Sequence, residues 1–155
     1  MAITISHKMT PFLAFQGNAE EAMEFYTSLF EDSATEQVIR ARAEDPGWSE
    51  GTLQHAIFTL AGQQFMCINT PPPGNHLHKV AAWHEFAFNP SFTIYLRCDS
   101  DEEFDRLYEA FAEKGEIHLP VASYGFSPKF AWVTDRYGIS WRLNLSTTEK
   151  AGAER

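Results

Sequence analysis

The sequence predicts an α+β fold in which two βαβββ modules form a curled mixed sheet with the helices outside. Three observations support this prediction. The segments 18–29 and 100–111 resemble each other at a constant offset of 82 residues (from 18 to 100), and both have the apolar spacing of a helix. An apolar extended run precedes each segment. Three strand-like segments follow each one.

The two helices are predicted from their first residues and their apolar spacing. Asn18 and Ser100 are typical N-cap residues, and Glu103 completes a capping box with Ser100. Apolar residues recur at i, i+3, i+4 and i+7 in both segments: Ala22, Phe25, Tyr26 and Leu29 in the first, and Phe104, Leu107, Tyr108 and Phe111 in the second. Each helix therefore has one face suited to packing on a sheet.

The strands are predicted from apolar runs and from the turns between them. The runs 11–15 and 92–96 precede the helices; the segments 34–42, 52–60 and 63–69 follow the first helix, and 116–123, 129–134 and 139–145 follow the second. Hairpin turns are expected at 61–62 and 135–138, where glycine accommodates positive φ. We expect a single domain over 1–150, made of module 9–69 and module 91–145 joined by loop 70–90, with a polar tail at 146–155.

Composition and charge exclude several classes of function. The 155 residues include 13 Phe, 5 Tyr and 4 Trp, ample material for a core, and carry a formal net charge of −9. A chain of this charge without a basic stripe is repelled by nucleic acid and by anionic membranes. No segment is apolar enough to span a bilayer, and the first residues do not resemble a secretory signal. We therefore expect a cytoplasmic protein with Cys67 and Cys98 reduced and buried.

Two stretches of the chain resemble a known family. Residues 11–26 are similar to the opening, and residues 124–141 to the closing hairpin, of the PhnB-like branch of the vicinal oxygen chelate superfamily. This superfamily includes glyoxalase I, extradiol dioxygenases and the bleomycin and fosfomycin resistance proteins. The resemblance implies the glyoxalase/bleomycin resistance/dioxygenase fold, a homodimer, and a cavity in each curled sheet.

The branch is often labelled demethylubiquinone methyltransferase, and this label fits the residues poorly. Methyl transfer from S-adenosylmethionine normally uses a glycine-rich turn that opens a helix. The glycines that come nearest to forming such a turn are Gly125 and Gly138, and both lie in predicted hairpin turns rather than at the start of a helix. Whether the protein is an enzyme is left open by the sequence.

Metal enzymes of the superfamily hold a divalent ion with His, Glu or Gln side chains from four strands. The internal duplication places the corresponding positions at Pro11, Thr93, Met66 and Arg142. None of these is a usual ligand, and the arginine repels a cation, so we expect neither a metal nor another cofactor. The alternative is a metal held by three histidines of the loop between the modules, which are His76, His78 and His84.

Several residues are candidates for a functional site. His55 is the candidate general base if its face of the strand lines the cavity, because its ordinary pKa lies near neutrality; the alternative is a hydrogen-bonded structural histidine. Arg142 on a strand facing a cavity needs a partner, which is either an anionic ligand or a salt bridge at a dimer interface or the surface. The further ligand-binding candidates are Cys67, His84, Tyr124, Phe126, Phe130, Trp132 and Trp141. The aromatic members are either core or the flat wall of a pocket.

The function expected from these residues is the binding of a small apolar or planar organic molecule without the usual divalent metal. The alternative is a small-molecule enzyme of the lyase, isomerase or dioxygenase type, which uses His55 as base or a metal held by the loop histidines. The expected partners are a second copy of the chain and the small molecule, with no nucleic acid and no membrane.

Overall fold

A computed structural model describes residues 3–70 and 87–146. The chain divides into two compact units, 1–86 and 87–155. Each unit contains one of the two predicted modules, and each is described by itself below. The prediction of a single domain over 1–150 stays a prediction.

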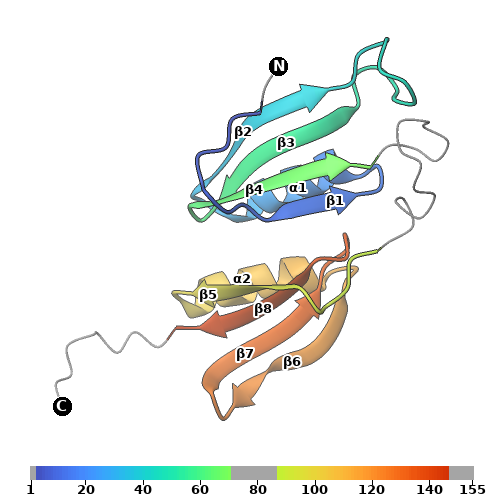
Figure 1. Ribbon diagram of the computed structural model, residues 1–155. Helices are drawn as coiled ribbons and strands as arrows, with labels where there is room; N and C mark the ends of the chain where they lie inside the picture. Colours follow the sequence, from blue (N-terminus) through green and yellow to red (C-terminus); the bar gives the residue numbers. More distant parts are fainter. Residues whose placement is uncertain (1–2, 71–86, 147–155) are drawn as a thin grey trace. The chain divides into compact units, whose positions relative to one another are not determined.

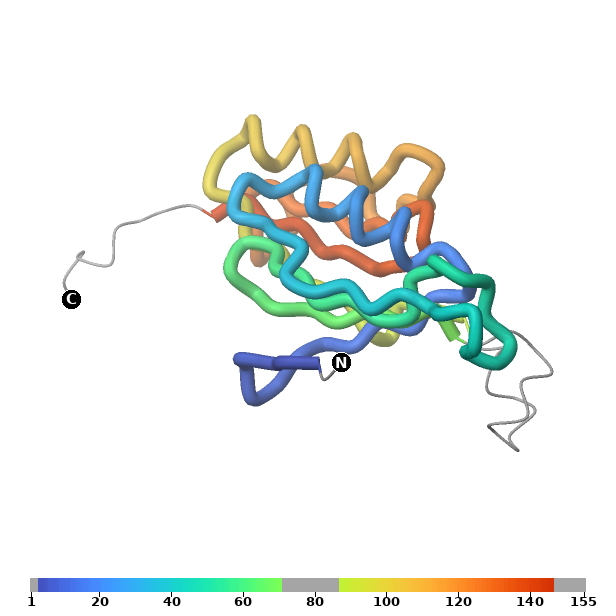
Figure 2. The backbone as a smooth tube through the Cα atoms, turned by 90° about the horizontal axis from the view of Figure 1, so that it is seen from above, coloured from blue at the N-terminus to red at the C-terminus, as the bar shows by residue number. Residues whose placement is uncertain are grey.

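The first unit is a βαβββ module, as predicted. Its elements are β1 (Phe12–Phe15), α1 (Ala19–Leu29), β2 (Ser33–Arg40), β3 (Leu53–Leu60) and β4 (Gln63–Asn69). The strands form one sheet in the order β1-β4-β3-β2, in which β1 and β4 are parallel and the other pairs antiparallel. Helix α1 lies over one face of this sheet (Figures 1 and 2). Ala22, Met23 and Tyr26 of α1 are buried there, so the apolar helix face packs on the sheet.

The second unit repeats this arrangement. Its elements are β5 (Thr93–Cys98), α2 (Asp101–Ala112), β6 (Glu116–Tyr124), β7 (Ser127–Thr134) and β8 (Ser140–Leu145). The sheet order is β5-β8-β7-β6, again with the strand before the helix parallel to the last strand. Phe104, Leu107 and Phe111 of α2 are fully buried. The predicted fold class is therefore confirmed, and the one-sided apolar spacing of each helix explains why it covers one face of its sheet.

The two helices are capped in different ways. In α2, the Ser100 hydroxyl accepts a hydrogen bond from the Glu103 backbone N–H at 3.1 Å, as predicted. In α1, the side chain of Asn18 makes no capping hydrogen bond. The cap comes instead from Asn69 at the end of β4, whose Oδ1 accepts from the backbone N–H groups of Gly17 and Ala19 at 3.1 and 2.9 Å.

The repeat of the two modules contains a one-residue difference in the turn between the first strand and the helix. From the last residue of β1, Phe15, the helix begins four positions later; from Cys98, the last residue of β5, it begins three positions later. The strands therefore correspond at an offset of 83 (15 to 98) and the helices at 82 (19 to 101). At the strand offset of 83, Thr93 corresponds to Thr10, and the predicted equivalence with Pro11 is wrong. The difference matters because a slip of one residue moves a strand side chain to the other face of the sheet.

Contacts from these threonines to the strand that comes last in each module along the chain, β4 or β8, support this corrected correspondence. The Thr10 hydroxyl donates to the amide oxygen of Gln64 on β4 at 3.4 Å. The hydroxyls of Thr93 and of Ser140 on β8 lie 2.7 Å apart.

In the part of the chain that the structure describes, no helix is long and apolar enough to cross a membrane.

Candidate functional site

The sheet of the second unit has a face that α2 does not cover, and we call this its open face. Trp141 lies on the other face, which α2 covers, and stacks on Phe111 of α2 with ring centroids 4.3 Å apart. Side chains alternate along a strand, so Arg142 points to the open face. Its pairing partners are Tyr95 on β5 and Trp132 on β7. One row of side chains therefore runs across three neighbouring strands of the open face.

Arg142 has an unsatisfied side chain within this row. Its guanidinium carbon Cζ lies 4.6 Å from the centroid of the Trp132 ring, a cation–π contact. Its Nε is buried and has no hydrogen-bond partner among residues 3–70 and 87–146. Buried N–H groups are almost always paired in folded proteins, so an unpaired one at a charged side chain indicates a place for an acceptor.

Trp132 is held in place by a hydrogen bond and by a contact with a second ring. Its indole Nε1–H donates to the Ser140 hydroxyl at 2.9 Å, and that hydroxyl also contacts Thr93. The imidazole of His118 on β6 lies 4.6 Å from the Trp132 ring, centroid to centroid. His118 is itself fixed by Thr134, whose hydroxyl lies 2.7 Å from its Nε2. The indole is thus a rigid platform flanked by an arginine and a histidine.

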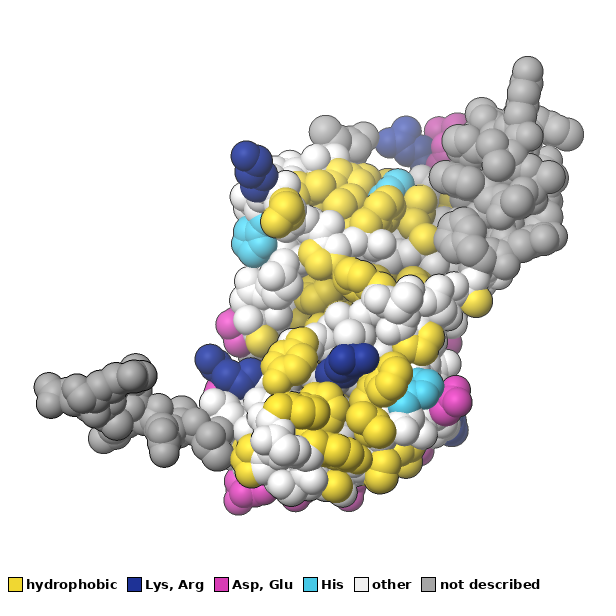
Figure 3. All heavy atoms as spheres, turned by 60° about the horizontal axis from the view of Figure 1, so that its bottom comes forward, with side chains coloured by type: hydrophobic (Ala, Val, Ile, Leu, Met, Phe, Trp, Pro, Cys, Tyr) yellow, Lys and Arg dark blue, Asp and Glu magenta, His cyan; other side chains and the backbone are white. Residues whose placement is uncertain are grey.

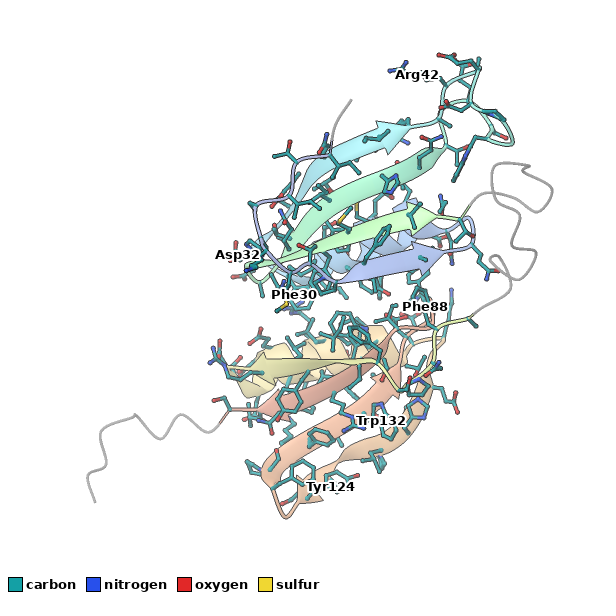
Figure 4. All side chains as sticks on the ribbon, in the orientation of Figure 1. Phe30, Asp32, Arg42, Phe88, Tyr124 and Trp132 are labelled. Carbon is teal, nitrogen blue, oxygen red and sulfur yellow. The ribbon has the colours of Figure 1, made fainter. Side chains whose placement is uncertain are left out.

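Aromatic side chains continue the open face toward the β6–β7 turn. Phe130 makes edge-on contacts with Tyr124 and Phe126 at centroid distances of 5.9 and 5.0 Å. Phe126 is 72% exposed, whereas Phe130 is buried beneath it. Hydrophobic side chains gather on this face of the second unit, with basic and histidine side chains among them (Figure 3). Trp132 and Tyr124 are labelled on β7 and β6 in Figure 4.

Two of the residues predicted to bind a ligand lie away from the open faces. Trp141 is 2% exposed, and its indole N–H donates to the buried carboxylate of Asp135 at 2.8 Å. Cys67 on β4 is fully buried beside Leu13, and burial raises its pKa to about 12. A thiol with this pKa is protonated at neutral pH and is a poor nucleophile. His84, another residue predicted to bind a ligand, falls outside the described residues.

The open face of the first unit, which is the face away from α1, contains His55. His55 shares its face of β3 with Ile57, and its pairing partner on β4 is Ile68. The Phe12 ring from β1 stacks on the imidazole with centroids 5.9 Å apart and an interplanar angle of 14°. Burial lowers the pKa of His55, so the imidazole is neutral at pH 7 and able to accept a proton.

Taken one sheet at a time, the residues paired between the first and last strands do not suit a divalent metal. On the first and last strands, Met66 pairs with Phe12 and Arg142 pairs with Tyr95. A thioether, two aromatic rings and a guanidinium supply no carboxylate or imidazole ligand. Among residues 3–70 and 87–146, no three His, Cys, Asp or Glu side chains gather as a metal site. The loop histidines His76, His78 and His84 lie outside these residues.

Comparisons with known proteins place this chain in a family. The family model described as 3-demethylubiquinone-9 3-methyltransferase matches residues 7–144. The chain belongs to this family. A solved structure from Bacillus cereus, described as a putative 3-demethylubiquinone-9 3-methyltransferase, PhnB protein, is 44% identical, covers 90% of this chain and all of its own, and superposes with a TM-score of 0.79.

Two further proteins are similar to this chain over most of its length. Protein YjdN of Escherichia coli K12 is 24% identical over 88% of this chain and 94% of its own. The fosfomycin resistance protein FosX of Listeria monocytogenes is 13% identical, covers 94% of this chain and 98% of its own, and has a TM-score of 0.59, which shows a shared fold. The family thus has the glyoxalase/bleomycin resistance fold that the sequence predicted.

Sequence reasoning placed Thr93 at a ligand position but missed three other polar and aromatic residues of the second unit's open face, which are Tyr95, His118 and Ser140. Alternation from Arg142 along β8 identifies Ser140, and pairing then identifies Thr93 and Tyr95. His118 has no such signal, because the β6–β7 pairing shifts register at three places. Bulges of this kind break the two-residue period on which strand faces are predicted.

Proposed function

We propose that this protein binds a small planar or apolar organic molecule on the open face of the second unit, without a divalent metal. One observation carries the proposal: a rigidly held indole, Trp132, lies in a row with the exposed ring of Tyr95 and the unsatisfied Arg142. Fixed aromatic surfaces with a few placed polar groups are typical of small-molecule sites. A homodimer and a cytoplasmic location, suggested by the family resemblance and the composition, stay predictions.

Calorimetric titration with two flat bicyclic probes, 2-naphthoate and its neutral counterpart 2-naphthamide, tests this proposal. We expect at least one probe to bind and the Trp132→Leu protein to bind it roughly tenfold more weakly, about 1.4 kcal/mol. The matched control is Trp48→Leu, since Trp48 lies in the β2–β3 loop of the first unit. This variant should bind like the unmodified protein. Failure of these two probes and of 2-naphthyl phosphate to bind, or equal binding by Trp132→Leu, would reject the proposal.

A second candidate function is a small-molecule enzyme of the lyase, isomerase or dioxygenase type with His55 as general base. The feature that favours it is the position of His55 on the open face of the first unit, where Phe12 stacks on the imidazole and burial lowers the pKa of His55. A base must hold a free lone pair at the working pH, and burial supplies that condition here.

The protonation of His55 is measurable without a substrate. We expect its ring protons in NMR spectra to titrate below the ordinary value of 6.5, with the signal assigned by its loss in His55→Gln. The unfolded chain then takes up this proton first as the pH falls, so protonation of His55 destabilises the fold below about pH 6.5. A titration at or above 6.5 would remove the reason to assign His55 the role of base.

A further inference from the structure

We infer that the molecule bound on the open face of the second unit is an aromatic compound with an oxyanion, and that the guanidinium of Arg142 binds this oxyanion. The inference rests on the proposed function and names the chemical class of its ligand. Its starting point is the buried Nε of Arg142, which has no hydrogen-bond partner within the described ranges. The contact with the Trp132 ring does not supply one.

The charge of Arg142 is also uncompensated, in contrast to that of other basic residues. Five of them form ion pairs with carboxylates: Arg40, Arg42, Arg97, Lys129 and Arg136. Arg142 forms none with a carboxylate of residues 3–70 or 87–146, although the chain has 21 acidic and 12 basic residues. Its neighbours across the sheet are Tyr95 and Trp132, which carry no negative charge. Within the described residues, the acidic excess of the chain therefore does not supply Arg142 with a counterion.

The chemistry of a guanidinium defines the missing partner. It offers donors in a fixed planar fork that matches the two oxygens of a carboxylate or of a phosphate. The cation–π contact with Trp132 orients this fork, and Trp132 is itself anchored to Ser140. A pre-oriented donor loses little side-chain entropy on binding. The site therefore favours an oxyanion over a neutral polar group.

The surroundings of Arg142 define the rest of the ligand. Tyr95 on the neighbouring strand is 59% exposed and lies directly beside Arg142 in the pairing register. On the other side, the row continues through Trp132 to the imidazole of His118. A flat ring attached to the oxyanion contacts aromatic side chains on either side of the guanidinium. An aromatic carboxylate and an aromatic phosphate ester both have this combination.

The test compares probes that share one flat body and differ in charge. We expect 2-naphthoate or 2-naphthyl phosphate to bind at least tenfold more tightly than 2-naphthamide, since a hydrogen bond to a charged group contributes about 1.5–3 kcal/mol. The stronger of the two anions identifies the source of the oxyanion. Equal affinity for the acids and the amide overturns the inference while the proposed function stands. Absence of binding by all three probes rejects both.

Variants of the arginine complete the test. Arg142→Met keeps the apolar stem and is expected to reduce the affinity for the anionic probes to that for 2-naphthamide, with the amide affinity changed by less than about twofold. Arg142→Lys keeps the charge without the planar fork and should lose roughly tenfold toward the anions. The control is Arg42→Met in the first unit, because Arg42 is exposed and paired with Glu44. Unchanged anion binding in both Arg142 variants overturns the inference, and a thermal melt of each variant verifies folding.

Discussion

Replacement of Trp141 by alanine is expected to lower the free energy of unfolding by about 4 kcal/mol, the range found for buried tryptophan. Trp141 is 2% exposed, stacks on Phe111 of α2 and donates its indole N–H to Asp135. The alanine variant leaves a cavity between α2 and the sheet and removes a donor from a buried carboxylate. Urea denaturation followed by circular dichroism measures the difference.

Two further variants separate the causes of this loss. Trp141→Phe keeps one ring for the stacking contact and removes the N–H donor and the second ring of the indole, so we expect a smaller loss of about 1–3 kcal/mol. Trp48→Ala in the β2–β3 loop is the control for loss of an indole outside the sheet of the second unit, with an expected change below about 1 kcal/mol. A loss below about 1.5 kcal/mol for Trp141→Ala would show that Trp141 does not belong to the core.

Replacement of Asn69 by alanine is expected to lower the free energy of unfolding by about 3 kcal/mol. Asn69 is 2% exposed, and its Oδ1 accepts from the backbone N–H groups of Gly17 and Ala19. Its Nδ2 donates to the Leu53 carbonyl at 2.9 Å. One substitution therefore leaves three backbone groups without a partner, and each costs about 1–3 kcal/mol when it stays buried.

The control for Asn69→Ala is a substitution at the N-cap of the second helix, α2. Ser100→Ala removes one capping hydrogen bond from α2 at an exposed site, so its expected cost is about 1 kcal/mol. The comparison is internal, because both substitutions act on the N-terminus of a helix in the same chain. An Asn69→Ala cost equal to or below that of Ser100→Ala would contradict the view that α1 depends on a cap from β4.

The elements of this fold were predictable because each has a local signal. The apolar spacing of 104–111 specifies a helix face, and the predicted segments 63–69 and 129–134 lie within or coincide with β4 and β7. The cap of α1 was not predictable, because Asn69 is 50 residues from the N–H of Ala19 that it accepts. Local sequence suggested Asn18 in that role. Long-range hydrogen bonds of this kind depend on the tertiary arrangement.

The candidate site was predictable only in part. Arg142 was identified because the internal duplication placed it at one of the superfamily's ligand positions, and the structure gives it an indole as neighbour. Trp141 and Arg142 are consecutive in β8, so alternation alone separates them onto opposite faces. The prediction treated the five aromatic candidates as one group, so it did not separate Trp141 from the residues of the open face. His118 required the bulged pairing of β6, which no period in the sequence reveals.

The difference of one residue between the two strand-to-helix turns has a consequence for protein engineering. A chimera that exchanges β1 and α1 for β5 and α2 as one block keeps every side chain on its proper face, because the block carries its own turn. A junction placed inside the strand and aligned on the helices shifts the grafted residues by one, which turns Phe12 inward and Leu13 outward. Recombination between the two halves of this protein is therefore restricted to crossover points outside the strand-to-helix segments.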